Sequence, residues 1–356
     1  MSAKRAGRAS RVSIPDPTLT DIAKLANVSV STVSRALAGG RGIAQETTDR
    51  VREVARKIGY RPGRIRIESE SKGILGLIVG NVASQFYSML VQAIEDAALR
   101  QGYNIILCNS NYQAEREHKY LEILMEKGVD GLIVAPIETR EPFMQSLLNE
   151  GVPIVQVDRN VEHLKCDLVC SDNVRGAQEA MQFLLQQGYE RIGIISGPAS
   201  HSTGRDRLAG CLQAMRDAER PVDRELIKMG DFRRESAYRL TQDLLEAARP
   251  PDALFAANLD MTKGALTALR DHGSSNIGLL GFDDFEDASL MTPPLTTIEQ
   301  PVRMMGATAA DLLIRRIAEQ AVHYEPVTIR LATRLIVRES TPPVGAAAAR
   351  ISNTAA

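Results

Sequence analysis

The strongest constraint on the fold is a regular alternation of short apolar runs and amphipathic segments that begins at Leu75. Eight apolar runs predict strands: Leu75–Val79, Asn104–Leu107, Gly131–Val134, Ile154–Val157, Leu168–Cys170, Ile192–Ile195, Ala253–Ala256 and Ile277–Gly281. Seven predicted helices lie between them: Phe86–Gln101, Glu115–Lys127, Glu141–Asn149, Arg175–Gln187, Asp206–Ala218, Glu235–Ala247 and Met261–His272. Strand–helix alternation at this period implies parallel, doubly wound sheets in an α/β protein.

These strands outnumber those of one compact sheet, and Gly-Tyr closes a helix before a strand twice, at Gly102-Tyr103 and Gly188-Tyr189. We therefore expect a core over residues 74–340 that is built from two similar lobes. The first is expected at about 74–159 and 286–320, and the second at about 160–285 and 321–338.

Open α/β sheets bind ligands beyond the carboxyl ends of their strands, and two facing lobes form a cleft that closes on a small molecule. An Asp or Asn after a strand is often only a helix cap, and an Arg only a surface charge, so the argument rests on their joint placement. Aromatic rings together with Asp, Asn and Arg are typical of sugar sites. The residues at the predicted strand ends are Phe86, Tyr87, Asp158, Arg159, Thr203, Arg207, Phe232, Asn258 and Asp283.

The formal net charge of −1 conceals a strong asymmetry along the chain. Residues 1–64 hold 13 basic and five acidic residues and carry +8, so the remainder carries −9. A basic end joined to an acidic body is typical of a nucleic-acid-binding module attached to another domain. Residues 1–17 are expected to form a disordered basic arm, and residues 18–62 a folded domain.

Residues 18–62 predict three short helices. Thr20 is expected to cap the first, in which Ile22, Leu25 and Ala26 fall at helical spacing. A turn at Asn27 precedes a second helix, Val30–Leu37, and a third follows at about Gln45–Ile58. A three-helix bundle with no DNA role is the alternative. The predicted exposed face of the second helix, with small hydroxyls and one Arg, favours a helix-turn-helix that enters the major groove.

The run Leu19–Leu37, continued by Gly59-Tyr60-Arg61-Pro62, resembles the DNA-binding end of the LacI/GalR family of bacterial repressors. The most specific part is the "Val-Ser-x-x-Thr-Val-Ser-Arg" core, while Asn27 stands where the family often has Gly. The resemblance implies that Val30, Ser31 and Arg35 read bases and that Ser29, Thr32 and Ser34 contact phosphates. The predicted DNA-binding set also contains Thr20, Arg61, Arg64 and Ile65.

The core resembles the family's periplasmic-binding-protein-like effector domain to about residue 338, through "Val-Asp-Arg", Ser171-Asp-Asn173, Gly281-Phe-Asp-Asp284 and Pro294-Leu-Thr-Thr-Ile-Glu-Gln300. All nine strand-end candidates match positions that contact effectors in the family, and the resemblance adds Gln300. It also adds His201, where purine-responsive relatives place a basic residue. Asp172 and Asn173 are expected to fix structure between the lobes.

The resemblance implies a homodimer that represses a carbohydrate-utilisation operon by binding palindromic operator DNA under the control of a small effector. Arg159, Arg207 and His201 make a sugar acid such as gluconate or ketogluconate plausible beside a neutral sugar. A nucleobase or nucleoside effector stays open as an alternative.

Two segments depart from the family. The hinge linker, residues 63–73, is Gly63-Arg-Ile-Arg-Ile-Glu-Ser-Glu-Ser71 followed by Lys72-Gly73, where the family has an Ala/Leu-rich helix that inserts Leu into the minor groove. Ile65 or Ile67 could take the place of that Leu. The tail, residues 341–356, is Ala-rich and without repeating Leu, so we expect it to be disordered and to form no tetramer-making coiled coil.

Other function classes find little support. An exported sugar-binding transport protein shares the two-lobed core, but a basic helix-turn-helix stands where its signal peptide would be. No Gly-x-Ser-x-Gly, Walker or dinucleotide motif indicates an enzyme. Cys108, Cys166, Cys170 and Cys211 fit no zinc spacing and are expected as reduced thiols. We therefore expect no metal, no cofactor, no membrane contact and a cytoplasmic location.

Overall fold

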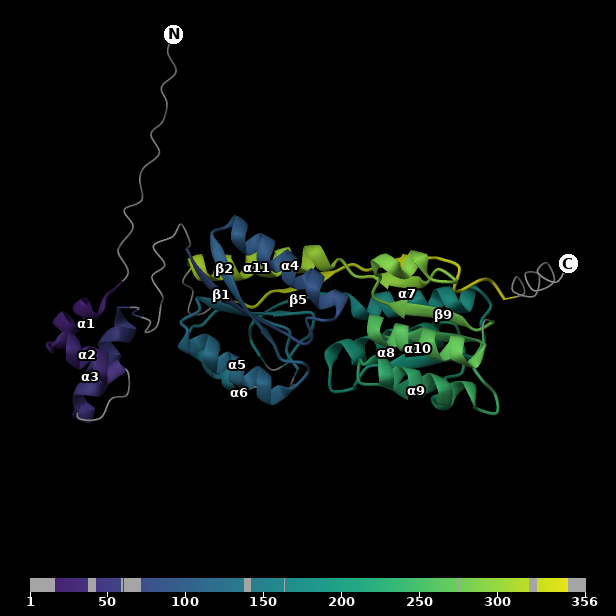
Figure 1. Ribbon diagram of the computed structural model, residues 1–356, viewed down its shortest axis with the longest axis horizontal. Helices are drawn as coiled ribbons and strands as arrows, with labels where there is room; N and C mark the ends of the chain where they lie inside the picture. Colours follow the sequence, from purple (N-terminus) through teal and green to yellow (C-terminus); the bar gives the residue numbers. More distant parts are fainter. Residues whose placement is uncertain are drawn as a thin grey trace, which may run out of the picture. The chain divides into compact units, whose positions relative to one another are not determined.

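The computed structural model describes residues 17–37, 43–58, 60, 72–137, 142–162, 164–274, 276–319 and 325–344. The chain divides into two compact units on either side of residue 67 (Figure 1). The predictions for the basic arm before residue 17, for residues 63–71 of the hinge linker and for the tail beyond Val344 lie outside the described residues. Arg61, Arg64 and Ile65 lie outside them as well. The first residues of the predicted disordered tail are ordered, since the Tyr189 hydroxyl donates to the Pro342 carbonyl and the Val344 amide donates to the Gln187 carbonyl, both at 2.8 Å.

The N-terminal unit consists of α1 (Leu19–Ala26), α2 (Val30–Leu37) and α3 (Gln45–Lys57) around a small apolar core. The expectation that Thr20 caps α1 is wrong. Thr18 is the cap, because its hydroxyl accepts from the Asp21 amide while the Asp21 carboxylate accepts from the Thr18 amide at 2.8 Å.

Side chains from all three helices meet in this core, which includes the fully buried Ile22, Val33 and Val51. Leu25 does not join it, contrary to its helical spacing, and is 62% exposed. Its side chain projects about 100° around the helix axis from that of the buried Ala26. Asn27 adopts the left-handed conformation (φ 53°) that the turn requires.

The first lobe holds a six-stranded parallel sheet in the order β11-β5-β4-β3-β1-β2. Helices α4 and α11 pack on one face and α5 and α6 on the other (Figure 1). Successive β1 side chains contribute to the two cores alternately. The strands are β1 (Gly73–Val79), β2 (Tyr103–Asn109), β3 (Gly131–Val134), β4 (Ile154–Val157), β5 (Asp167–Ser171) and β11 (Thr328–Leu331), and the helices are α4 (Gln85–Arg100), α5 (Ala114–Glu126), α6 (Pro142–Asn149) and α11 (Val302–Glu319).

The second lobe holds a sheet in the order β12-β10-β9-β8-β6-β7, in which only β12 is antiparallel to its neighbour. A single apolar core joins this sheet to helices α7 to α10. Its strands are β6 (Ile192–Ser196), β7 (Ile227–Met229), β8 (Ala253–Ala256), β9 (Gly278–Phe282), β10 (Thr296–Glu299) and β12 (Arg334–Ile336). Its helices are α7 (Asn173–Gln186), α8 (Ser202–Asp217), α9 (Arg234–Leu245) and α10 (Leu259–His272), with short 3-10 turns at Arg224–Leu226 and Glu286–Leu290.

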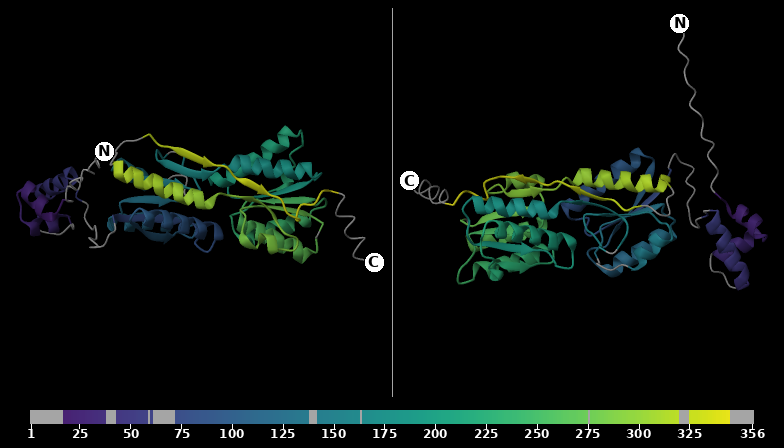
Figure 2. Two further views of the ribbon diagram at one scale, coloured as in Figure 1. Left: turned by 90° about the horizontal axis from the view of Figure 1, so that it is seen from above. Right: turned by 180° about the vertical axis from the view of Figure 1, so that it is seen from behind.

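The two predicted lobes of doubly wound parallel strands are present, but their expected boundaries are wrong at three strands. β5 and β11 belong to the first sheet, and β10 belongs to the second. The physical reason is that the sheet to which a strand belongs depends on its pairing with strands that are distant in the sequence. The apolar pattern of the strand itself does not indicate which strands those are. The chain consequently crosses between the lobes three times, at residues 171–173, 299–302 and 331–334 (Figure 2).

The three crossings are held to one another. The Asp172 amide donates to the Leu331 carbonyl at 2.8 Å, which joins the first crossing to the third. Arg334 pairs with Glu299 at 2.7 Å, which joins the third to the second. The four cysteines are buried free thiols, and among the described residues no helix is long and apolar enough to cross a membrane.

Candidate functional site

A cavity lies where the carboxyl ends of strands from both lobes meet. The space open to water-sized molecules is about 30 Å³, well below the usual range for ligand pockets, so in this arrangement of the lobes the side chains nearly fill the cavity. Each lobe contributes six lining residues, and each follows a strand. They are Ser84, Phe86, Tyr87, Tyr112, Asp158 and Arg159 from the first lobe, and Thr203, Arg207, Phe232, Asn258, Asp283 and Gln300 from the side of the second.

Asp158 directly follows β4 and is almost completely buried. Its carboxylate accepts a hydrogen bond from the Tyr87 hydroxyl at 3.0 Å, and Arg159 Nε lies 3.6 Å from the same oxygen. Burial raises the pKa of Asp158, and the nearby Arg159 and Arg207 charges oppose that rise. Tyr87 is held in turn by an edge-to-face contact with Phe86, whose ring centre is 5.1 Å away.

The Arg159 guanidinium lies between aromatic rings contributed by the two lobes. Its central carbon is 5.2 Å from the centre of the Tyr112 ring and 5.1 Å from that of Phe232. The side chain is 6% exposed, and its Nε and Nη1 atoms have no hydrogen-bond partner. Burial raises the pKa of Tyr112 to about 12, so this ring remains a neutral phenol at physiological pH. Arg159 therefore offers unused donors inside the cavity.

Arg207 is held from three directions. Its Nε donates to Asn173 at 2.8 Å, its Nη1 donates to the Ala257 carbonyl at 2.5 Å, and its guanidinium carbon lies 3.8 Å from the centre of the Phe282 ring. Burial lowers the pKa of Arg207, while the charges of Asp283 and Asp158 oppose this effect. These three contacts fix the direction in which the guanidinium faces the cavity.

Asp283 follows β9 and is buried at the opposite side of the cavity. One carboxylate oxygen accepts the Leu259 amide at 3.0 Å, and the other accepts the side-chain amide of Gln300. The remaining side-chain oxygen of Gln300 is buried without a hydrogen-bond partner. Next to them Asn258 caps α10 through the Met261 amide at 2.9 Å. This side of the cavity thus offers an unused acceptor.

Three cavity residues adopt a backbone conformation that residues other than Gly rarely take. The φ angles are 66° for Asp158, 66° for Phe232 and 78° for Asp283. Such conformations cost free energy and persist where the surroundings enforce them, frequently at functional sites. Each of the three follows a strand end and directs its side chain toward the cavity.

Ten of the eleven residues predicted for the effector site line this cavity. His201 does not line it. Its ring packs edge-to-face on Phe232 at 5.8 Å, and burial lowers its pKa to about 4. The sequence prediction missed Ser84 and Tyr112. Both follow strands, as the predicted residues do, and that position was the available signal.

The N-terminal unit places a polar surface on α2. Val30, Ser31, Ser34 and Arg35 are exposed, opposite the buried Val33 and Ala36. The predicted contacts Ser29 and Thr20 are exposed as well, and Thr32 is half-buried.

Hydrogen bonds order this surface. The Ser29 hydroxyl accepts from the Thr32 amide at 3.1 Å and lies 2.8 Å from both the Ser31 and the Thr32 hydroxyl. Arg35 Nε donates to the Ser31 carbonyl at 3.3 Å. Within the described ranges, no three His, Cys, Asp or Glu side chains gather as metal ligands would.

Comparison with known proteins connects both units to one family. The sequence model for bacterial regulatory proteins of the lacI family matches residues 18–63. The model for periplasmic binding proteins and the sugar binding domain of the LacI family matches residues 72–338. The chain therefore belongs to the LacI family and is a DNA-binding transcriptional regulator with an effector domain.

The HTH-type transcriptional repressor PurR of Escherichia coli O1:K1 / APEC is 33% identical to this chain, over 91% of the chain and 96% of that protein. A solved complex of the transcriptional regulator CelR with cellobiose is 32% identical, with a TM-score of 0.69 over 91% of this chain and 99% of that one. The lac repressor dimer bound to operator and the anti-inducer ONPF is 26% identical, with a TM-score of 0.68 over 92% of this chain and all of that one.

Proposed function

We propose that this regulator is a repressor of a carbohydrate-utilisation operon and that a sugar or sugar acid in the cavity controls its affinity for operator DNA. The observation that carries the proposal is the composition of the cavity. Unused donors on Arg159, an unused acceptor on Gln300 and two buried carboxylates lie among aromatic rings.

Sugars match this set because each hydroxyl both donates and accepts, while the C–H faces of the ring pack on aromatic side chains. The two arginines and two aspartates that line the cavity balance in charge, which suits a neutral sugar. A sugar acid such as gluconate or ketogluconate would place its carboxylate near Arg159, where unused donors lie.

The cavity joins the lobes, so a ligand there favours one arrangement of the lobes over another. Near the cavity the Asn160 amide donates to the Ser202 hydroxyl at 2.9 Å, and Glu162 forms an ion pair with Arg205. These contacts link the loop after β4 to α8. A ligand that binds one lobe arrangement more tightly changes operator affinity by the same coupling free energy.

For DNA binding we propose that α2 lies in the major groove. Val30, Ser31 and Arg35 would contact base edges, and Ser29, Thr32 and Ser34 would contact phosphates, with Thr20 at the edge of the same surface. A homodimer would bring two such helices to the two halves of a palindromic operator. The similar lac repressor structure is a dimer bound to its operator.

The effector is tested with a thermal-shift screen of neutral sugars, aldonic acids and keto-aldonic acids on the wild-type protein and on Asp283→Ala. A sugar or sugar acid should raise the melting temperature of the wild type, since a ligand of the native state stabilises it. The variant should lose that response. A carbohydrate panel that leaves the wild-type melting temperature unchanged would contradict the proposal.

A nucleobase or nucleoside effector is the second candidate, favoured by the place of His201. Its neutral imidazole lies against Phe232 at the edge of the cavity, and PurR is among the relatives of this chain. Adenine, guanine, hypoxanthine and their nucleosides therefore belong in the same screen. A response to these compounds alone would favour the second candidate.

A further inference from the structure

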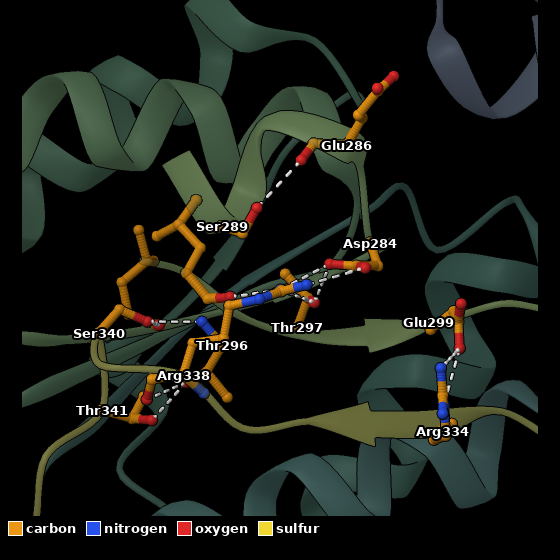
Figure 3. A network of polar contacts seen from close by, with 12 residues as sticks. Asp284, Glu286, Ser289, Thr296, Thr297, Glu299, Arg334, Arg338, Ser340 and Thr341 are labelled. Atoms are coloured by element: carbon orange, nitrogen blue, oxygen red, sulfur yellow. Dashed lines mark hydrogen bonds and ion pairs between the residues drawn. The ribbon is translucent and has the colours of Figure 1, made fainter. Parts of the chain in front are cut away.

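The segment Arg338 to Thr341 contacts residues that follow β9 and residues of β10 in the second lobe (Figure 3). The Arg338 Nη1 donates to one carboxylate oxygen of Asp284 at 2.7 Å, and its Nη2 donates to the other at 3.1 Å. Nη1 also lies 2.7 Å from the Leu295 carbonyl and 3.0 Å from the Thr297 hydroxyl. A two-pronged pair of this kind fixes direction as well as distance.

The partner of Arg338 adjoins a cavity residue. Asp284 follows Asp283, whose φ of 78° turns its carboxylate toward Leu259 and Gln300. The Thr297 hydroxyl donates to Asp284 at 2.5 Å, and the Asp283 amide donates to the Ile298 carbonyl at 2.9 Å. The two aspartates are therefore held at two points: β10 accepts the backbone amide of Asp283, and Arg338 with Thr297 binds the side chain of Asp284.

Asp284 ionises readily in this arrangement. Burial alone would raise its pKa, but the hydrogen bonds from Arg338 and Thr297 lower it overall. The carboxylate therefore stays charged at neutral pH and keeps both bonds to the guanidinium. Arg338 itself does not line the cavity.

We propose that Arg338 is a positioning residue of the effector site: its pair with Asp284 holds the neighbouring Asp283 carboxylate in the direction of the cavity. An arginine outside the cavity would thus set the geometry of one of its acceptors. The role of that acceptor in binding an effector rests on the proposed function, whereas the position of the carboxylate is testable without any ligand.

The alternative is that Arg338 only anchors the end of the chain. Ser340 separates the two possibilities. It is buried two residues further on and makes a comparable set of bonds, since it donates to the Leu279 carbonyl at 2.6 Å and accepts from the Thr296 amide at 2.8 Å. It has no bond to Asp283 or Asp284. Loss of Ser340 therefore weakens the anchor and leaves the aspartate pair in place.

The Leu259 amide reports the position of the Asp283 carboxylate. Leu259 begins α10, where the first amides of a helix lack a partner within the helix, and Asp283 is the acceptor that the structure gives it. Its hydrogen exchange, measured by NMR on the whole chain, should be about tenfold faster or more in Arg338→Ala, relative to the exchange of the β8 amide of Phe255. Arg338→Lys should restore part of the protection, because one ammonium cannot make both bonds.

Two variants serve as controls. Ser340→Ala weakens the attachment of the chain end, and Arg334→Ala removes a nearby positive charge that belongs to an exposed ion pair. Neither should change the ratio of Leu259 to Phe255 exchange. Asp284→Asn keeps the side-chain shape, and it should accelerate Leu259 exchange as Arg338→Ala does. A ratio in Arg338→Ala no higher than in Ser340→Ala would overturn the proposal. Because no effector enters this measurement, failure of the proposed function in the ligand screen stays distinguishable from failure here.

Discussion

Arg207 donates a hydrogen bond from Nε to the side-chain oxygen of Asn173 at 2.8 Å. Asn173 is the first residue of α7, directly after the chain crosses from the first sheet into the second. The Arg207 guanidinium, which lines the cavity, is therefore hydrogen-bonded to the segment in which the chain crosses between the lobes. This contact supports the expectation that Asn173 serves the junction between them, because a shift of the crossing would displace the guanidinium.

Replacing Asn173 by Ala should destabilise the protein by roughly 1.5–3 kcal/mol, since it removes a hydrogen bond to a buried charged group. The free energy of unfolding in urea measures this directly. Gln178→Ala is the matched control, because Gln178 also lies on α7 but its bond to Asp217 is at the surface. Equal losses for the two variants would show that the Arg207 contact is worth no more than a surface bond.

Asp283→Ala should abolish the effector response and leave operator affinity nearly unchanged. The carboxylate lines the cavity, and ligand-driven control requires contacts that differ between the two lobe arrangements. Calorimetry with the ligand found in the screen and an operator titration with and without it provide the two readouts. Asp287→Ala, at an exposed position four residues on, should behave as wild type. Undiminished ligand affinity in Asp283→Ala would remove this residue from the site.

Arg35→Ala should weaken operator binding by roughly 1–3 kcal/mol and relax specificity at one position per half-site. Thr32→Ala should weaken binding to all sequences about equally, because a phosphate contact carries no sequence information. The operator is first selected from a random duplex library, and both variants are then titrated with it and with a scrambled duplex. If Arg35→Ala lost equal affinity for both duplexes, its assignment to a base would be wrong.

His201 should make the protein less stable as the pH falls from about 6.5 toward 4. Burial lowers the pKa of His201 from 6.5 to about 4 in the folded chain, so in this interval the unfolded chain binds a proton that the folded chain does not. The unfolded state gains stability and the free energy of unfolding declines, with no contribution from this group above pH 6.5.

Urea midpoints across this interval should therefore fall less steeply in His201→Gln than in the wild type. His272→Gln, at an exposed ring, is the control and should follow the wild type. Parallel wild-type and His201→Gln curves would show that this imidazole titrates in the folded protein as it does in the unfolded chain.

The sequence predicted the alternating strands and helices well where burial makes the pattern clear. It missed the strands β7, β10, β11 and β12 and the helix α11. β11 alternates exposed and half-buried residues, and β7 is a three-residue edge strand, so neither forms an apolar run. The membership of β5, β10 and β11 was also unpredictable from local pattern, because it depends on pairing between distant segments.

Position after a strand predicted nine of the residues that line the cavity, since parallel strands bring their carboxyl ends to one edge, and the family resemblance added Gln300. The sequence did not predict Tyr112 as a cavity residue, because its position depends on a turn in which Asn111 and Tyr112 both have positive φ, at 50° and 56°. The location of Arg159 between Tyr112 and Phe232 depends on side-chain packing across two lobes. No spacing along the chain encodes that contact.

The three crossings also constrain the order in which the molecule can be completed. β11 at the edge of the first sheet and β12 at the edge of the second are both delivered by residues 328–336, near the end of the chain. The first three hundred residues contain neither β11 nor β12, so each sheet still lacks an edge strand when they have been synthesised. A cut at residues 171–173 would leave the first sheet without β11, and a cut at residues 299–302 would leave the first sheet without β11 and the second without β12, so we expect neither sheet to be complete before residues 328–336 are made.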